Sequence, residues 1–109
     1  MKTLSRFGLS GLTAGLLMAT GQAFAHNPLC TCEPVGEEEI RCTGGFSDGS
    51  GAPGVTLDVI SYNEEILVPG KLGDDSSMTF ARPDDEFYIL FDAGPGHVVE
   101  VDHTEVPGP

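Results

Sequence analysis

The sequence predicts an all-β protein, a single small antiparallel β-sandwich of about six to seven strands that follows a cleaved signal peptide. Short runs rich in β-branched and aromatic residues recur from residue 39 to residue 103. Gly, Pro, Asp and Asn separate these runs at hairpin spacing, which is typical of antiparallel strands. No amphipathic helical pattern interrupts them after residue 25. Removal of 25 of the 109 residues leaves 84, enough for one domain with a modest core.

The first 25 residues have the features of a secretory signal peptide. Lys2 and Arg6 give a basic start, residues 7–18 are apolar, and Ala-Phe-Ala at 23–25 is the small-x-small pattern that signal peptidase recognises. The apolar run is too short for a membrane anchor, which needs about 20 residues. We therefore expect cleavage after Ala25, with residues 21–23 as a second usable site.

The segment just after this site argues against a lipoprotein. Asn-Pro-Leu at 27–29 precedes Cys30, whereas a lipoprotein signal has small residues before its cysteine. The mature protein is therefore expected to be periplasmic or secreted, without direct insertion into the membrane.

The candidate strands follow one another along the mature chain. They are residues 39–46, 55–62, 65–68, 78–81, 86–93 and 97–103. The alternation of Val55, Leu57 and Val59 with polar residues is the clearest period of two. Residues 86–93 are apolar on both faces, which predicts a central strand.

The chain is accordingly divided into four segments. After the signal peptide come an N-terminal Cys-containing segment with the first strand, the β-sandwich module and a flexible tail. Their expected ranges are 1–25, 26–44, 45–104 and 105–109.

A Gly-rich turn at 45–49 is followed by Ala-Pro-Gly-Val-Thr-Leu at 52–57, and Lys-Leu-Gly-Asp-Asp at 71–75 precedes Met-Thr-Phe at 78–80. These segments resemble carboxypeptidase-regulatory-like, or Cna-B-like, β-sandwich modules of the transthyretin type. Serines occupy positions 76–77, where that family usually has glycine. The resemblance covers about 60 residues and implies a fold more than a function.

A second resemblance concerns function. The chain has Ala-His at the expected cleavage site, residues 25–26, carries this module and contains Asp-Ala-Gly-Pro-Gly-His at 92–97. In these features it is similar to small periplasmic accessory proteins of bacterial nickel and cobalt uptake. This resemblance implies a membrane metal transporter, or another envelope protein, as the partner.

The mature chain is strongly acidic. All 17 Asp and Glu residues follow residue 25, against only Arg41, Lys71 and Arg82, so its formal charge is −14. This charge argues against nucleic acids and anionic lipids as partners, because phosphate binding needs clustered Lys and Arg. A cationic partner, a metal ion or a merely solvated acidic surface fits this charge.

Two histidines are candidate metal ligands. Cleavage after Ala25 would make His26 the N-terminus, and its α-amine and ring Nδ1 would then form a chelating pair suited to Cu, Ni or Co. His97 could share this site at a strand start, with Asp92 nearby. His103 would lie about 20 Å from His97 on a continuous strand, too far to bind the same ion. The alternatives are that His26 is incidental and that His97 is a polar strand-edge residue.

Cys30, Cys32 and Cys42 form the other cluster. In an oxidising compartment we expect a disulfide from Cys42 to Cys30 or Cys32, because a bridge between Cys30 and Cys32 would be strained. A Cys32–Cys42 bridge would close a loop of roughly ten residues and stabilise the fold by about 2–3 kcal/mol. Alternatively, the three thiolates and His26 could bind Cu(I) or Zn. The two interpretations exclude each other in the oxidised protein.

The sequence predicts no enzyme, since no arrangement of nucleophile, base and acid is visible. A copper monooxygenase with an N-terminal His needs a larger sandwich than 84 residues provide. We therefore expect a periplasmic transition-metal-binding accessory protein. The alternative is a non-catalytic interaction module of the cell envelope that docks through its edge strands.

Overall fold

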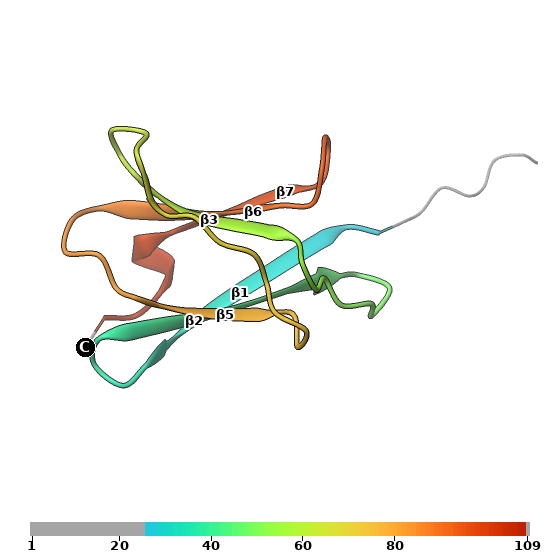
Figure 1. The fold of residues 1–109 in the computed structure, drawn as a ribbon, viewed down its shortest axis with the longest axis horizontal. Helices are drawn as coiled ribbons and strands as arrows, with labels where there is room; N and C mark the ends of the chain where they lie inside the picture. The colour runs from blue at the N-terminus through green and yellow to red at the C-terminus, as the bar shows by residue number, and fades with distance from the viewer. Residues whose placement is uncertain (1–25, 109) are drawn as a thin grey trace, which may run out of the picture.

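The computed structural model describes residues 26–108, so the predicted signal peptide lies outside the described residues. Seven strands and one short 3-10 helix follow one another along this part of the chain (Figure 1). They are β1 (Pro28–Val35), β2 (Glu39–Phe46), β3 (Thr56–Ser61), β4 (Ile66–Val68), β5 (Ser77–Ala81), β6 (Phe87–Asp92), β7 (Val98–Asp102) and η2 (His103–Glu105). Each predicted strand is present, with bounds close to those expected.

The strands form two antiparallel sheets packed as a sandwich, which confirms the predicted fold class. One sheet has the order β1-β2-β5 and the other the order β4-β3-β6-β7. Strand β6 lies between β3 and β7, as its two-sided apolar pattern predicts.

Strand β1 was not predicted. It pairs with β2 along its whole length, from Pro28 opposite Phe46 to Val35 opposite Glu39. Its two prolines argue against a strand, but β1 is an edge strand, where a missing N–H can face away from the sheet. The Cys-containing segment is therefore an integral part of the sandwich, together with β2.

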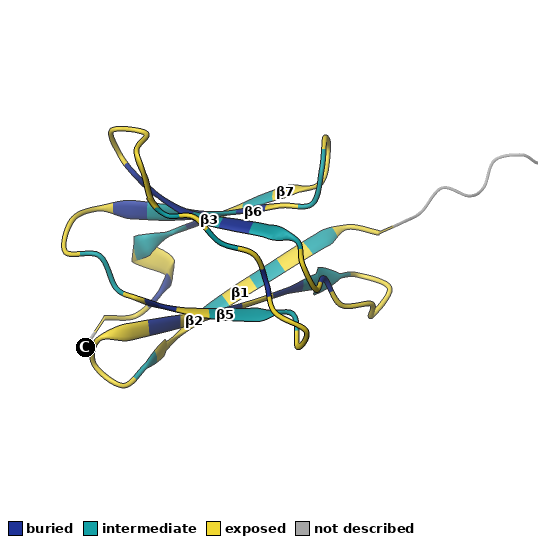
Figure 2. Ribbon diagram, viewed as in Figure 1, coloured by how far each residue is buried: buried dark blue, intermediate teal, exposed yellow. Residues whose placement is uncertain are grey.

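The core lies between the sheets, and burial follows the period of two on β2 and β6 (Figure 2). Gly44 of β2 is required there because a Cβ at this position would come within 2.6 Å of Phe91 and 2.8 Å of Leu72. The largest fully buried side chains are Phe87, Phe91, Ile40, Leu57, Ile89, Val59 and Cys42.

Part of the C-terminal segment that was expected to be a flexible tail, at 105–109, packs against the sandwich. Val106 is buried, and the guanidinium of Arg82 donates hydrogen bonds to the carbonyls of Val106 and Pro107 at 3.3 and 2.7 Å. One apolar side chain and one cation thus hold residues 106–107 against the sandwich. Among the described residues, no helix has the length and apolar character needed to cross a membrane.

Candidate functional site

Two predicted ligands, His26 and His97, line one pocket of about 300 Å³, together with Phe46, Ser50 and Ala93. His26 lies just before β1, and His97 lies in the hairpin between β6 and β7. The start of β1, the end of β2 and this hairpin meet at the right-hand end of the view in Figure 1. The fold therefore brings together two histidines that are far apart in the sequence.

The residue after His26 is fixed by two reciprocal hydrogen bonds. The backbone N–H of Asn27 donates to Ser47 Oγ at 2.9 Å, and the N–H of Ser47 donates to the carbonyl of Asn27 at 2.8 Å. The imidazole of His26 lies edge-on to the ring of Phe46, with centroids 6.4 Å apart. The first residue of the expected mature chain is thus attached to the folded domain.

Asp48 is the residue at this site that the sequence analysis missed. Its Oδ2 lies 3.0 Å from His26 Nε2, while its Oδ1 accepts hydrogen bonds from the hydroxyl and the N–H of Ser50 at 2.6 and 2.9 Å. These Ser50 bonds are the main reason that the pKa of Asp48 lies below its usual value, and His26 adds to the effect. The sequence analysis interpreted residues 45–49 only as a Gly-rich turn, although Asp two residues before Ser is typical of an Asx-turn.

The β6–β7 hairpin determines the position of His97. The N–H of Ala93 donates to the His97 carbonyl at 2.9 Å, and the N–H of His97 donates to the Gly94 carbonyl at 2.8 Å. The ring Nδ1 lies 3.1 Å from the carbonyl of Pro95. An Nδ1–H that donates to this carbonyl leaves the lone pair of Nε2 free to bind a metal ion.

Asp92 and His103 do not line this pocket. The Oδ1 of Asp92 accepts the N–H of Gly94 at 2.9 Å, which stabilises the hairpin turn. The ring of His103 packs against Phe87 and Tyr62, with centroid distances of 5.5 and 5.8 Å.

The cysteines form the disulfide Cys32–Cys42, between residues directly opposite each other on β1 and β2. Cys30 remains a free thiol, and burial raises its pKa to about 11, so it stays protonated at neutral pH. The three sulfurs lie within 4.8 Å of one another, the one such group of three potential ligands among residues 26–108. In the oxidised protein the disulfide occupies two of them, and His26 is not part of the group.

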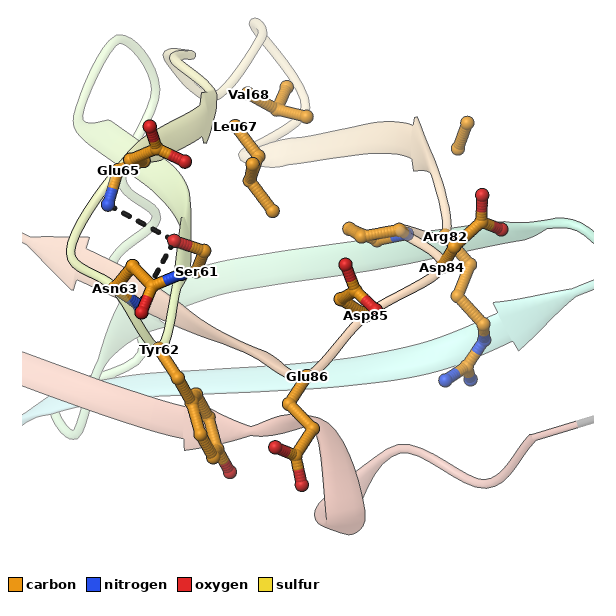
Figure 3. Close-up of a pocket in the computed structure, with 12 residues that line it drawn as sticks. Ser61, Tyr62, Asn63, Glu65, Leu67, Val68, Arg82, Asp84, Asp85 and Glu86 are labelled. Atoms are coloured by element: carbon orange, nitrogen blue, oxygen red, sulfur yellow. Dashed lines mark hydrogen bonds between the residues drawn. The ribbon is translucent and has the colours of Figure 1, made fainter.

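Figure 3 shows a second, larger pocket of about 660 Å³. Its lining segments lie at the opposite end of the sandwich in Figure 1. The pocket separates the β3–β4 hairpin from residues 81–86, which lead from β5 to β6. Leu67 of edge strand β4 is exposed beside it. Four carboxylates line this acidic cleft: Glu65, Asp84, Asp85 and Glu86.

Comparison of the chain with models of known protein families, with curated protein sequences and with solved structures found no match.

Proposed function

We propose that the mature protein is an exported transition-metal-binding accessory domain that uses His26 and His97 as ligands. The observation that carries this proposal is the shared pocket of the two imidazoles at the N-terminus of the expected mature chain. The resemblance to accessory proteins of nickel and cobalt uptake agrees with it.

The donor set suits a transition metal ion. Cleavage after Ala25 would supply the α-amine of His26 beside its ring Nδ1, and His97 would add a third nitrogen. Nitrogen donors of this kind favour Cu, Ni and Co over Mg or Ca. The formal charge of −14 attracts cations to the surface in general, while the pocket provides a defined place to bind one. In this proposal the domain binds and delivers metal without catalysing a reaction, and its partner is a membrane metal transporter or an envelope protein.

Intact mass spectrometry of the exported protein tests the proposal. The precursor is purified from the periplasm, and its mass is recorded under denaturing and native conditions. We expect a denatured chain that begins at His26, carries one disulfide and retains one Cu, Ni or Co ion in the native spectrum.

Two variants serve as comparisons in this experiment. An alanine inserted before His26 removes the free amine of the histidine, and His97→Ala removes the third nitrogen. Both are expected to weaken metal binding. The proposal would be overturned if the mature chain stays bare after metal is added, or if both variants bind metal as tightly as the unaltered chain.

The exposed edge strand β4, beside the acidic cleft, favours a second candidate function, the non-catalytic interaction module. Edge strand β4 leaves its outer backbone groups unpaired, and Ile66 and Leu67 are 57% and 41% exposed. Such an edge can accept a strand from another protein. A photo-crosslinking residue at Leu67 should then capture one envelope protein, independently of a chelator, while the same residue at exposed Arg41 of central strand β2 should not. Equal products from both positions, or none, would contradict this function.

A further inference from the structure

We infer that Asp48 is a positioning residue that orients the ring of His26 for a three-nitrogen Cu(II) site made of the His26 α-amine, His26 Nδ1 and His97 Nε2. This inference rests on the proposed function and adds the identity of the metal and the residue that prepares its first ligand.

The first step concerns the two nitrogens of the His26 ring. Asp48 Oδ2 lies 3.0 Å from Nε2, so an ionised Asp48 favours the tautomer in which Nε2 carries the proton. The lone pair is then on Nδ1. Within one histidine residue, Nδ1 is the ring atom that can close a six-membered chelate with the residue's own amine, whereas Nε2 is too distant. The contact with Asp48 therefore occupies the nitrogen that the chelate does not use.

The second step concerns the rigidity of Asp48. The hydroxyl and the N–H of Ser50 both hold its other carboxylate oxygen, at 2.6 and 2.9 Å. The neighbouring Asn27–Ser47 bonds attach the chain next to His26 to the same turn. A carboxylate fixed in this way acts as the outer partner of a metal-binding histidine, which sets the orientation of its ring and raises its basicity.

The third step concerns His97, which is oriented by its other nitrogen. Its Nδ1 lies 3.1 Å from the Pro95 carbonyl, so Nε2 is the available donor. The two imidazoles on the pocket thus offer opposite ring atoms, Nδ1 from His26 and Nε2 from His97. With the α-amine of His26, this site would have three neutral nitrogen donors.

The chemistry of these donors selects the metal. The other residues that line the pocket are Phe46, Ser50 and Ala93, which supply neither a thiolate nor a carboxylate. For nitrogen donors, affinity rises from Co(II) through Ni(II) to Cu(II), and tetragonal nitrogen sites are typical of Cu(II). The expected order of affinity is therefore Cu(II) above Ni(II) above Co(II).

The chain contains a matched control for Asp48. Asp75 forms the same turn, since its Oδ1 accepts hydrogen bonds from the N–H and the hydroxyl of Ser77 at 3.0 and 2.8 Å. In the described part of the chain, the histidine–carboxylate pairs are His26–Asp48 and His103–Asp102, so Asp75 does not contact an imidazole. Asp48→Asn and Asp75→Asn therefore remove the same turn charge, and the first alone changes the partner of His26.

The experiment uses mature protein that begins at His26, as verified by mass, and titrates it with Cu(II), Ni(II) and Co(II) against a competing chelator. We expect Asp48→Asn to weaken Cu(II) binding about 10- to 100-fold. It should also alter the nitrogen hyperfine pattern of the Cu(II) electron paramagnetic resonance spectrum. Asp75→Asn should change neither quantity. His97→Ala should reduce the number of coupled nitrogens by one.

The outcomes separate this inference from the proposed function. If none of the three metals binds, both the proposed function and the inference fail. If metal binds through His26 and His97 but Asp48→Asn behaves like Asp75→Asn, or if Ni(II) or Co(II) binds more tightly than Cu(II), the proposed function stands and the inference fails. Asp48→Glu, which keeps the carboxylate, should restore part of the lost affinity if Asp48 acts on His26 as inferred.

Discussion

The hydrogen bond between Tyr62 and Asp102 shifts the pKa values of both side chains. The Tyr62 hydroxyl donates to Asp102 Oδ1 at 2.6 Å, and Thr104 donates to Oδ2 through its hydroxyl at 2.7 Å and its N–H at 3.1 Å. The bond from Tyr62 is the largest cause that lowers the pKa of Asp102 to about 2, and the same bond raises the pKa of Tyr62 to about 12. The charged carboxylate and the neutral phenol are the favoured forms.

The first prediction concerns Tyr62→Phe. Because the folded-state pKa of Asp102 is depressed, its contribution to stability is present above the ordinary pKa of about 4 and is lost as the pH falls toward 2. Without the phenol, the pKa of Asp102 should rise toward its ordinary value, so this loss of stability should be smaller and should be complete at a higher pH. An NMR titration of the Asp102 carboxyl measures the shift. Tyr88→Phe, which removes a bond to Glu64 instead, should leave it unchanged.

Single residues also show what sequence reasoning could predict about the site. His26 and His97 were identified because a residue expected at a mature N-terminus and one beside a Pro-Gly turn have recognisable local patterns. Asp48 was missed because its role depends on the pairing of Pro28 with Phe46, which brings the start of β1 to the turn after β2. Asp92 was assigned by proximity in sequence, although its carboxylate is used within its own turn.

At the scale of elements, the β1–β2 hairpin shows why sequence spacing could predict a disulfide at Cys42 but not which of Cys30 and Cys32 is its partner. A bridge between Cys30 and Cys32 was excluded as strained, so Cys42 was expected to pair with one of these two residues. The stabilisation from closing the loop was estimated from sequence spacing alone. Recognition of β1 would have required its register, because Pro28 and Pro34 lower its strand propensity. In that register Cys32 lies opposite Cys42, whereas Cys30 lies opposite Gly44.

The second prediction concerns this disulfide. It closes a loop of about ten residues, so its reduction should lower the free energy of unfolding by about 2–3 kcal/mol. Urea unfolding of the oxidised and reduced forms of Cys30→Ala measures the difference without exchange from the third thiol. A difference below about 0.5 kcal/mol would show that the hairpin restricts the unfolded chain little.

The third prediction concerns the contact between the sheets at Gly44. A methyl group there would lie 2.6 Å from Phe91 and 2.8 Å from Leu72, both of which are buried. Gly44→Ala should therefore destabilise the domain by about 1–3 kcal/mol through overpacking.

Gly73→Ala is the control for this substitution, because its added Cβ would meet its nearest atoms at 3.5–3.6 Å, an ordinary contact distance. Its effect on the free energy of unfolding, measured by denaturant titration, should stay within about 0.5 kcal/mol. Equal midpoints for the two variants would mean that the sheets adjust at Gly44 without loss of stability.

At the scale of the whole molecule, the charged surface and the apolar core contribute to stability in ways that respond differently to ionic strength. The core is a small apolar layer between two sheets, and its contribution changes little with ionic strength at low salt. Residues 26–109 carry 17 acidic side chains against three basic ones. Within residues 26–108, both ion pairs involve histidine, so these pairs leave most of the carboxylates without a fixed positive partner. Self-repulsion of the carboxylates therefore opposes the compact state at neutral pH.

The fourth prediction follows from this repulsion. An increase in NaCl from 10 mM to 1 M shortens the screening length from about 30 Å to about 3 Å, so the melting temperature at pH 7 should rise. The rise should shrink near pH 3, because protonation removes much of the negative charge that the salt screens. Calorimetric scans at both pH values and both salt concentrations distinguish this effect from a general salting-out of apolar surface, which would raise the melting temperature equally at the two pH values. A melting temperature that falls with salt at pH 7 would instead mean that attractive charge contacts outweigh the repulsion among the 17 carboxylates.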